Sequence, residues 1–302
     1  MSQQQRTAVD TQLRSAGLDT SRPIAEQRES FAALMAGPAP SGVSLAGTTL
    51  GGRPALELTP DGDRAGGTIL YFHGGSWVVG SPATAQDLTA ALVRRTRTRA
   101  VSLDYRLAPE HPFPAAIEDG VAAYRDLLDQ GVPADQIILS GDSAGGGLSV
   151  NTALAARDAG LPRAAGIVAF SPGLDATRSG DSMTTKEGVD PLFTKAALDQ
   201  LTPLYLAGQD PRQPLLSPAV YADLAGLPPL LVQAGSNEIL LDDSTRLATR
   251  AAAAGVDVIL DVTADVPHVF QLYEGNLDEA DAALDRAARF IRDRLPARLV
   301  AR

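Results

Sequence analysis

The feature that most constrains the fold is an alternation of apolar runs and helix-like segments between residues 68 and 295. The predominantly apolar runs are residues 68–72, 100–103, 136–139, 166–170, 230–233 and 256–260. Segments with helical periodicity lie between or after them, at residues 85–95, 117–128, 144–159, 240–254 and 277–295. Apolar strands alternating with helices are typical of a parallel sheet that is covered on both faces. We therefore predict an α/β fold with a mostly parallel sheet.

The chain before this alternation predicts helices followed by a hairpin. Residues 1–45 are helical in pattern at first and irregular afterwards. The helical pattern ends at Gly37-Pro38-Ala39-Pro40. Residues 43–50 and 54–58 are strand-like and flank Gly51-Gly52, which indicates a β-hairpin. We interpret residues 1–45 as cap helices and residues 46–302 as the main domain.

A second region outside the alternation runs from about residue 176 to residue 227. It contains helical and proline-rich pieces but no clear strand. In α/β folds such excursions sit over the carboxyl ends of the strands, where ligands bind. We predict a cap insertion at 176–227, and we expect Phe31, Leu34 and Met35 of the N-terminal helices to help enclose a small apolar pocket.

Composition excludes several classes of partner. With 26 basic and 36 acidic residues the net charge is −10, and phosphate binding needs clustered Lys and Arg, so we expect no nucleic-acid partner. The chain has no cysteine, which excludes disulfides and thiolate chemistry and is compatible with the cytosol. No apolar run approaches the roughly 18 residues of a membrane span. We expect a cytoplasmic protein that acts on a small molecule.

The pentapeptide Gly141-Asp142-Ser143-Ala144-Gly145 fits the pattern G-x-S-x-G. A predicted buried strand precedes it and a helix of small residues follows, which is the setting of a nucleophile elbow. Glycines allow the sharp turn that exposes the serine, and the positive end of the following helix dipole points toward it. Ser143 is therefore the candidate nucleophile.

A serine nucleophile needs a base, and the chain has three histidines, His73, His111 and His268. In the chain order serine, acid, histidine only His268 follows Ser143. The acid should follow a strand and precede His268, which favours Glu238 just after the strand at 230–233.

Asp242 and Asp243 are the alternatives to Glu238. They fall at the start of the next predicted helix, where a carboxylate caps the helix or favours its dipole, and we expect them to face water.

Acyl transfer also needs hydrogen-bond donors for the developing oxyanion. His73-Gly74-Gly75-Ser76 follows the first apolar strand, where glycines leave backbone N–H groups unobstructed. We expect the donors among Gly74, Gly75 and Ser76, together with the N–H of Ala144, the residue after the nucleophile.

Together these motifs closely resemble the hormone-sensitive-lipase-like family of α/β-hydrolases, the bacterial family IV carboxylesterases. The resemblance covers residues 68 to 270 and rests on 73–75, 104–115, 141–146, Glu238 and His268. It implies an eight-stranded sheet, a helical cap, hydrolysis of esters with small acyl groups without a cofactor, and structural roles for His73 and His111. Dimers paired through the last strand are common in this family.

Two positions depart from the family pattern. Ser76 stands where a third glycine is usual, and Glu238 stands where many members have aspartate. Since Ser76 keeps its backbone N–H, we expect the oxyanion site to be retained. Glutamate is an accepted triad acid in related enzymes.

We therefore predict a serine carboxylesterase for short-chain acyl esters, with Ser143, Glu238 and His268 as its triad. The chain also resembles lactone hydrolases of monoterpene degradation, since a lactone is a cyclic ester. A third interpretation is a small-molecule receptor on the same fold. The plant gibberellin receptors that resemble this family lack the triad histidine, whereas His268 is present here.

Overall fold

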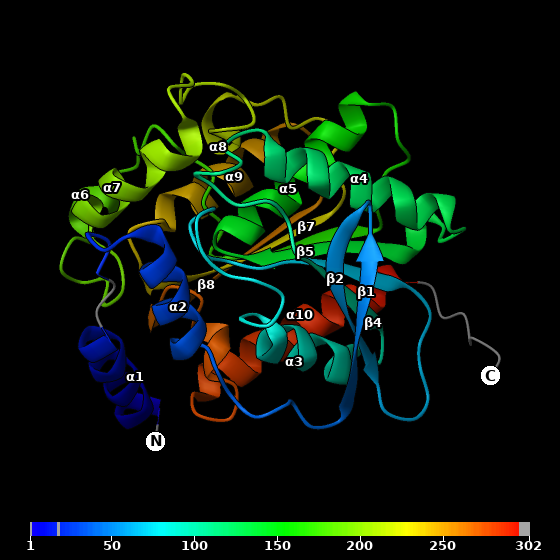
Figure 1. Ribbon diagram of the computed structural model, residues 1–302, viewed down its shortest axis with the longest axis horizontal. Helices are drawn as coiled ribbons and strands as arrows, with labels where there is room; N and C mark the ends of the chain where they lie inside the picture. The colour runs from blue at the N-terminus through cyan, green and yellow to red at the C-terminus, as the bar shows by residue number, and fades with distance from the viewer. Residues whose placement is uncertain (1, 17–18, 296–302) are drawn as a thin grey trace.

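The protein folds around one eight-stranded sheet, as the computed structural model shows for residues 2–16 and 19–295 (Figure 1). The strands are β1 (Val43–Leu50), β2 (Arg53–Pro60), β3 (Thr68–Phe72), β4 (Arg99–Leu103), β5 (Ile137–Asp142), β6 (Gly166–Phe170), β7 (Leu230–Asn237) and β8 (Val258–Pro267). Their order in the sheet is β1-β2-β4-β3-β5-β6-β7-β8. Only β2 runs antiparallel to its neighbours, so the six strands from β4 to β8 are parallel. The predicted α/β-hydrolase fold is confirmed.

Helices cover both faces of the sheet (Figure 1). On one face lie α4 (Ala115–Asp129), α5 (Ala144–Asp158) and α9 (Leu241–Ala253), and on the other lie α3 (Gln86–Thr96) and α10 (Asp278–Arg294). Two short 3₁₀ helices, η1 (Ala134–Gln136) and η2 (Phe270–Tyr273), lie in the connections. This layering follows from right-handed crossovers between parallel strands.

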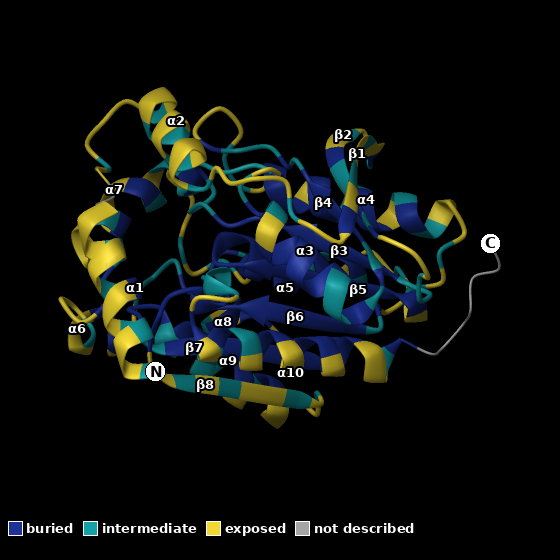
Figure 2. Ribbon diagram, turned by 90° about the horizontal axis from the view of Figure 1, so that it is seen from below, coloured by how far each residue is buried: buried dark blue, intermediate teal, exposed yellow. Residues whose placement is uncertain are grey.

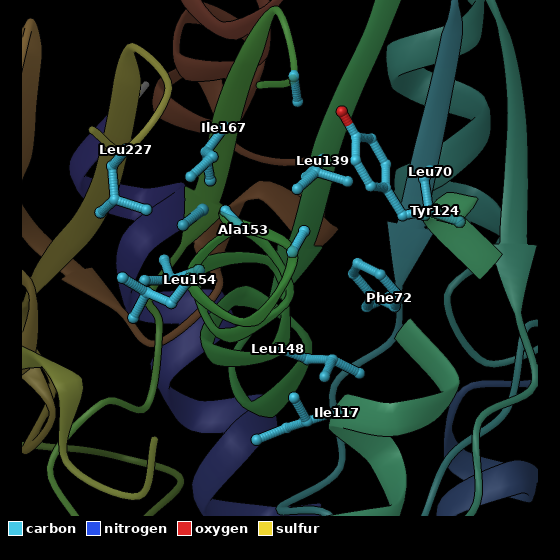
Figure 3. Packing of buried hydrophobic residues seen from close by; sticks show 14 of the residues in the cluster. Leu70, Phe72, Ile117, Tyr124, Leu139, Leu148, Ala153, Leu154, Ile167 and Leu227 are labelled. Carbon is cyan, nitrogen blue, oxygen red and sulfur yellow. The ribbon is translucent and has the colours of Figure 1, made fainter. Parts of the chain in front are cut away.

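The two cores follow from the period of two along each strand. In β3, Leu70 and Phe72 point toward α4 and α5, while Ile69 and Tyr71 join the core beneath α3 and α10. All five residues of β3 are buried. Figure 3 shows the first core, with Leu148 of α5 among the side chains that pack around the helix. Because the central strands are buried on both faces, they read as apolar runs in the sequence.

The N-terminal helices are α1 (Ser2–Ala16) and α2 (Ile24–Leu34). α1 packs against α10 and β8, where Arg6 pairs with Glu279. α2 is attached to the loops after β3 and β4, because Arg28 donates hydrogen bonds to the carbonyl oxygens of Val78 and Ala108, both at 2.9 Å. The segment 176–227 forms α6 (Ser182–Thr185), α7 (Lys195–Leu206) and α8 (Pro218–Tyr221), without a strand, as expected.

The last strand differs from the expectation of apolar strands buried on both faces. β8 is longer than the predicted 256–260 and lies at the edge of the sheet, with Ile259, Leu260 and Val262 exposed. Figure 2 shows this contrast between β8 and the buried β6. An edge strand has a neighbour on one side only, so its sequence carries no strong burial signal. Among the described residues, no helix is long and apolar enough to cross a membrane.

Candidate active site

The Ser143 turn connects β5 to α5 at the carboxyl end of the sheet. Ser143 has φ 53° and ψ −119°, a conformation that L-residues rarely adopt. Its N–H donates to the carbonyl of Phe170 at 2.8 Å, and its own carbonyl accepts from Gly147 and Gly173 at 3.0 and 3.1 Å. These three bonds hold the side chain above the sheet edge, at the N-terminus of α5.

A close approach of two loops explains one glycine of the pentapeptide. A Cβ on Gly145 would lie 2.0 Å from the carbonyl oxygen of Phe72, at the end of β3. No side chain fits there unless the backbone moves. The glycine therefore allows α5 to start directly against β3, the strand that leads into residues 73–76.

The structure brings Ser143, His268 and Glu238 together in a chain of hydrogen bonds. Nε2 of His268 lies 2.9 Å from Oγ of Ser143, and Nδ1 lies 2.5 Å from Oε2 of Glu238. The other carboxylate oxygen, Oε1, accepts the N–H of Gly235 at 3.1 Å. Glu238 is fully buried and His268 is 4% exposed. Glu238 follows β7 and His268 follows β8, so the ends of neighbouring parallel strands place them side by side.

Two opposing effects set the pKa of His268. Burial lowers it, but the hydrogen bond and the negative charge of Glu238 raise it, and the carboxylates of Asp190 and Asp142 add to the rise. The net result is a pKa above the ordinary histidine value. The site therefore favours the imidazolium form, which is the form a histidine base takes after it has accepted a proton.

The loop after β3 is held beside Ser143 by a buried polar network. Asp142 accepts the hydroxyl of Tyr71 at 2.8 Å and a backbone hydrogen bond from Gly74. Burial raises the pKa of Asp142 to about 6, although both bonds lower it. Tyr105 donates its hydroxyl to the carbonyl of His73 at 2.7 Å and stacks on the imidazole of His73 with ring centroids 4.2 Å apart.

Beyond Gly74 the loop adopts an unusual backbone. Gly75 has φ 124°, and a Cβ there would lie 2.1 Å from the carbonyl oxygen of Val79. Ser76 is also in the left-handed region, with φ 52°. The N–H of Gly74 is engaged with Asp142. Gly75 and Ser76 are therefore the residues of this loop whose N–H groups are not bound to that carboxylate.

His73 and His111 occupy different environments from His268. His73 is fully buried, and burial lowers its pKa to about 4, so the ring is neutral near pH 7. His111 is exposed. Neither takes part in the hydrogen bonds of Ser143 or Glu238. In the described part of the chain, no group of three or more His, Asp or Glu residues is arranged to hold a metal ion.

A cavity of about 700 Å³, including its open mouth, leads to Ser143. Its lining residues include Ser76, Trp77, Ser143 and Ala144. Residues of the segment 176–227 also line it, namely Ala176, Arg178, Phe193, Leu198, Thr202, Tyr205, Leu215 and Leu216. Phe31, Leu34 and Met35 are not among its lining residues, and Leu34 is 46% exposed.

The similarity to known proteins agrees with this geometry. Residues 69–272 match the profile of a family with the α/β-hydrolase fold. An acetyl-hydrolase of Streptomyces hygroscopicus is 46% identical over 227 residues, which cover 75% of this chain and 76% of that protein. The crystal structure of an esterase from the bacterial hormone-sensitive lipase family superposes with a TM-score of 0.93, at 40% identity, and covers 96% of this chain and 98% of that one.

The chain belongs to the hormone-sensitive-lipase-like family of α/β-hydrolase-fold carboxylesterases. A putative acetyl-hydrolase of Mycobacterium tuberculosis, LipR, is 34% identical over 269 residues, with 88% of this chain and 86% of that protein covered. An esterase of Acinetobacter venetianus is 38% identical over 223 residues, with 74% and 73% covered. The chain is thus a carboxylic ester hydrolase, and the receptor interpretation is set aside.

Sequence reasoning missed a carboxylate that joins the cap insertion of this hydrolase to the Glu238 loop. Asp190 is buried, and its Oδ2 accepts the N–H of Ile239, the residue after Glu238, at 2.9 Å. Its Oδ1 accepts the N–H groups of Leu192 and Phe193, and the Phe193 ring meets the imidazole of His268 edge to face at 5.0 Å. Only the three-dimensional packing reveals this role, because Asp190 lies 48 positions before Glu238 in a segment without a motif.

The expectation that Asp242 and Asp243 face water is wrong for Asp243. Asp243 is 2% exposed and accepts the N–H groups of Leu174 and Asp175 at 2.6 and 2.9 Å. Asp242 accepts the N–H of Ser182 at 3.0 Å. Both carboxylates thus bind the backbone that leads into the insertion, and this packing overrides the usual role of acidic residues in a first helical turn.

We predict that Asp243 makes the folded protein less stable as pH rises. Burial raises its pKa to about 8, although the two backbone bonds lower it. Between about pH 4 and pH 8 the folded protein holds a proton that the unfolded chain releases, so the free energy of unfolding falls as pH increases. In D243N this contribution should vanish, because the amide keeps an acceptor oxygen and has no such proton.

Urea unfolding of the wild type and D243N at about pH 5 and about pH 8 measures this contribution. The matched control is D242N at the neighbouring carboxylate, which should keep the wild-type pH dependence. D243A should be less stable at every pH by about 1–3 kcal/mol, because two buried N–H groups lose their acceptor. An unchanged pH dependence in D243N would show that Asp243 is ionised in the folded state.

Proposed function

We propose that the protein hydrolyses short-chain acyl esters through a Ser143–His268–Glu238 triad and an acyl-enzyme intermediate. The observation that carries this proposal is the buried chain of hydrogen bonds from Ser143 Oγ through His268 to Glu238, with lengths of 2.9 and 2.5 Å. The names of the similar proteins, esterase and acetyl-hydrolase, support the class of substrate.

In the first half of the reaction, Oγ of Ser143 attacks the ester carbonyl carbon. His268 accepts the hydroxyl proton at Nε2, and the resulting imidazolium is stabilised by Glu238. The elevated pKa of His268 supports this role, because proton transfer becomes easier as the base becomes stronger. The imidazolium then gives the proton to the leaving alcohol oxygen, and the acyl group stays on Ser143.

Backbone donors stabilise the negative charge that forms on the carbonyl oxygen. We assign the N–H groups of Gly75, Ser76 and Ala144 to this oxyanion. Gly74 is left out, because its backbone hydrogen bond goes to Asp142. The position of Ala144 at the first turn of α5 adds the positive end of the helix dipole.

In the second half, His268 removes a proton from a water molecule, which attacks the acyl carbonyl. The tetrahedral intermediate collapses, Ser143 recovers its proton from the imidazolium, and the free acid leaves. The same residues and donors serve both halves, so the reaction needs no further group on the protein.

We predict that esters with acyl chains of about two to six carbons are hydrolysed much faster than those of twelve or more. The bulky rings of Trp77, Phe193 and Tyr205 are among the lining residues of the cavity and leave little room for a long acyl chain. Initial rates on p-nitrophenyl esters of graded length measure this preference, with a monoterpene lactone added to the panel.

The control for this panel is S143A, which should lose roughly 10⁴-fold or more in kcat while its circular dichroism stays unchanged. An S143A enzyme that retains a tenth of the wild-type kcat would contradict the assignment of the nucleophile. A rate that climbs steadily up to long-chain triglycerides would contradict the small pocket.

We predict that E238Q lowers kcat by about 10²–10⁴ and shifts the pH profile to lower pH. In the wild type, activity falls when acid protonates His268, and Glu238 raises the pKa at which this happens. Without the carboxylate, burial dominates and the pKa of His268 drops, so the acidic limb of kcat/KM moves toward acid.

The pH dependence of kcat/KM between about pH 5 and pH 9 measures this shift. The matched control is D242N, four residues along the chain, which should keep the wild-type limb and at least a tenth of the activity. If D242N were inactive and E238Q active, Glu238 would not be the triad acid.

We also propose that the protein forms a homodimer through β8. Its free edge and the exposed Ile259, Leu260 and Val262 support pairing with a second copy. Analytical ultracentrifugation at micromolar concentration should give about twice the mass of 31.4 kDa. L260K should sediment as a monomer, because a twofold axis would bring two lysines together on an apolar surface. A wild-type monomer at these concentrations would contradict the proposal.

A further inference from the structure

The cavity extends from Ser143 along one face of α5. Ala144 and Asn151 both line it, and they are seven residues apart, which is two helical turns or about 10 Å along the axis. Gly147 lies between them on the same face, and a Cβ there would lie 3.4 Å from the six-membered ring of Trp77. The lining residues of the cavity on α5 thus run from Ala144 to Asn151, on the helix face that Trp77 and the carbonyl of Gly173 cover at Gly147.

Asn151 is a polar group without a partner among the lining residues of this cavity. It is 2% exposed, and its Oδ1 has no hydrogen-bond partner among the described residues. A buried amide oxygen that lacks a donor destabilises the protein, so a retained one indicates that something else supplies the hydrogen bond.

A second buried polar atom lines the same cavity. Tyr205 of α7 stacks on Trp77 with ring centroids 4.4 Å apart, and its hydroxyl has no partner in the described part of the chain. Burial raises the pKa of Tyr205, so the phenol keeps its proton and is able to donate. Asn151 offers an acceptor and Tyr205 offers a donor, which are the two partners that an alcohol hydroxyl uses.

The proposed mechanism decides which part of the substrate enters this end. The leaving alcohol oxygen has to lie near Nε2 of His268, which protonates it, and Phe193 packs against that imidazole. The carbonyl oxygen points toward the N–H of Ala144. The remaining substituent of the carbonyl carbon is the acyl chain, which we assign to the part of the cavity that Asn151 lines.

The charges around the cavity favour a neutral group over an anion. Asp175 and Asp243 are among its lining residues, and Asp175 is paired with Arg246. The one guanidinium among its lining residues, Arg178, is already bound to Asp199, to the carbonyl of Leu198 and to Thr202. A second carboxylate on the substrate would therefore find no free cation among the lining residues.

We propose that the acyl pocket recognises acyl chains that carry a neutral hydroxyl group several bonds from the carbonyl, with Asn151 and Tyr205 as its hydrogen-bond partners. This inference rests on the ester hydrolysis proposed above and names its substrate class. Ala144 and Asn151 are about 10 Å apart along the helix axis, and the Asn151 side chain points back toward the helix N-terminus, which shortens this distance. The remaining distance fits a hydroxyl about four to six bonds from the carbonyl carbon.

The test compares two esters of equal length, ethyl 6-hydroxyhexanoate and ethyl heptanoate, which differ by a hydroxyl in place of a methyl group. A pH-stat follows acid release, and the quantity compared is the ratio of the two kcat/KM values. In N151L, where leucine has a similar shape and no polar atoms, the ratio should fall about tenfold below the wild-type ratio. In Y205F, which lacks only the hydroxyl, it should fall about threefold or more.

The matched control is T152V on the same helix. Thr152 is buried, and its hydroxyl also lacks a partner among the described residues, but it faces Gly120 of α4 and is not a lining residue. T152V should keep the wild-type ratio. Since Y205F removes a single oxygen, it keeps the test decisive if N151L fails to fold.

Three results have separate meanings. If the wild type hydrolyses both esters and neither N151L nor Y205F changes the ratio, the hydroxyl site is wrong while the esterase proposal stands. A preference for 2-hydroxyethyl butanoate over propyl butanoate that N151L abolishes would place the hydroxyl on the alcohol side and overturn the inference. If the wild type hydrolyses no ester, the proposed function itself fails.

Discussion

The conformation of Ser143 is the constraint on which the rest of the site depends. A serine in this backbone region costs of order 1–3 kcal/mol, so its surroundings have to hold it there. They do so through the sheet, because Asp142 pairs with Phe170 in the register of β5 and β6, and Phe170 also accepts the N–H of Ser143. Ser143 is thus placed by β5 and β6, two central strands in which every residue is buried. The loops only complete the surroundings of a side chain whose position the core already fixes.

Around this turn the fold buries carboxyl groups, which is unfavourable unless backbone donors offset the loss of water. Glu238 accepts hydrogen bonds from the N–H of Gly235 and from the imidazole of His268. Asp190 accepts hydrogen bonds from three backbone N–H groups. Asp243 accepts hydrogen bonds from two N–H groups. Burial and the nearby carboxylate of Asp175 raise its pKa to about 8. Glu238 and Asp243 therefore differ in character although both are buried. Glu238 faces an imidazole that accepts positive charge, whereas the hydrogen bonds that Asp243 accepts from Leu174 and Asp175 come from neutral backbone amides.

The fold and the motif residues could be predicted from the sequence because both depend on short-range patterns. Residues 68–72 and 166–170 are buried on both faces, so their apolar runs match β3 and β6 in full. Chain order alone selected His268, and strand position selected Glu238, the two residues that the structure joins to Ser143 through hydrogen bonds. The ends of parallel strands meet at one edge, and motif spacing along the chain therefore carries information about distance in space.

The remainder of the site depends on contacts that leave no local pattern. The sequence placed Asp243 in a first helical turn, where acids usually face water, but the chain at Leu174 and Asp175 covers it. It likewise gave no reason to single out Asp190 or Asn151, because the insertion and the outer face of α5 meet only in three dimensions. The exposed β8 was harder to delimit than β3, since a strand with one neighbour has a mixed burial pattern.

The segment 176–227 links the wall of the cavity to the loop of Glu238. Its backbone is bound to the chain around Glu238 by Asp190, Asp242 and Asp243, and it also supplies Phe193 and Tyr205 to the cavity wall. A displacement of this segment would therefore move the pocket wall and the acid loop together. Substitutions at single lining positions on α5, such as Asn151, avoid this coupling, since α5 is anchored to the sheet and not to the insertion carboxylates. The fold thus leaves the polarity of this part of the cavity to a helix that is already fixed by the Ser143 turn.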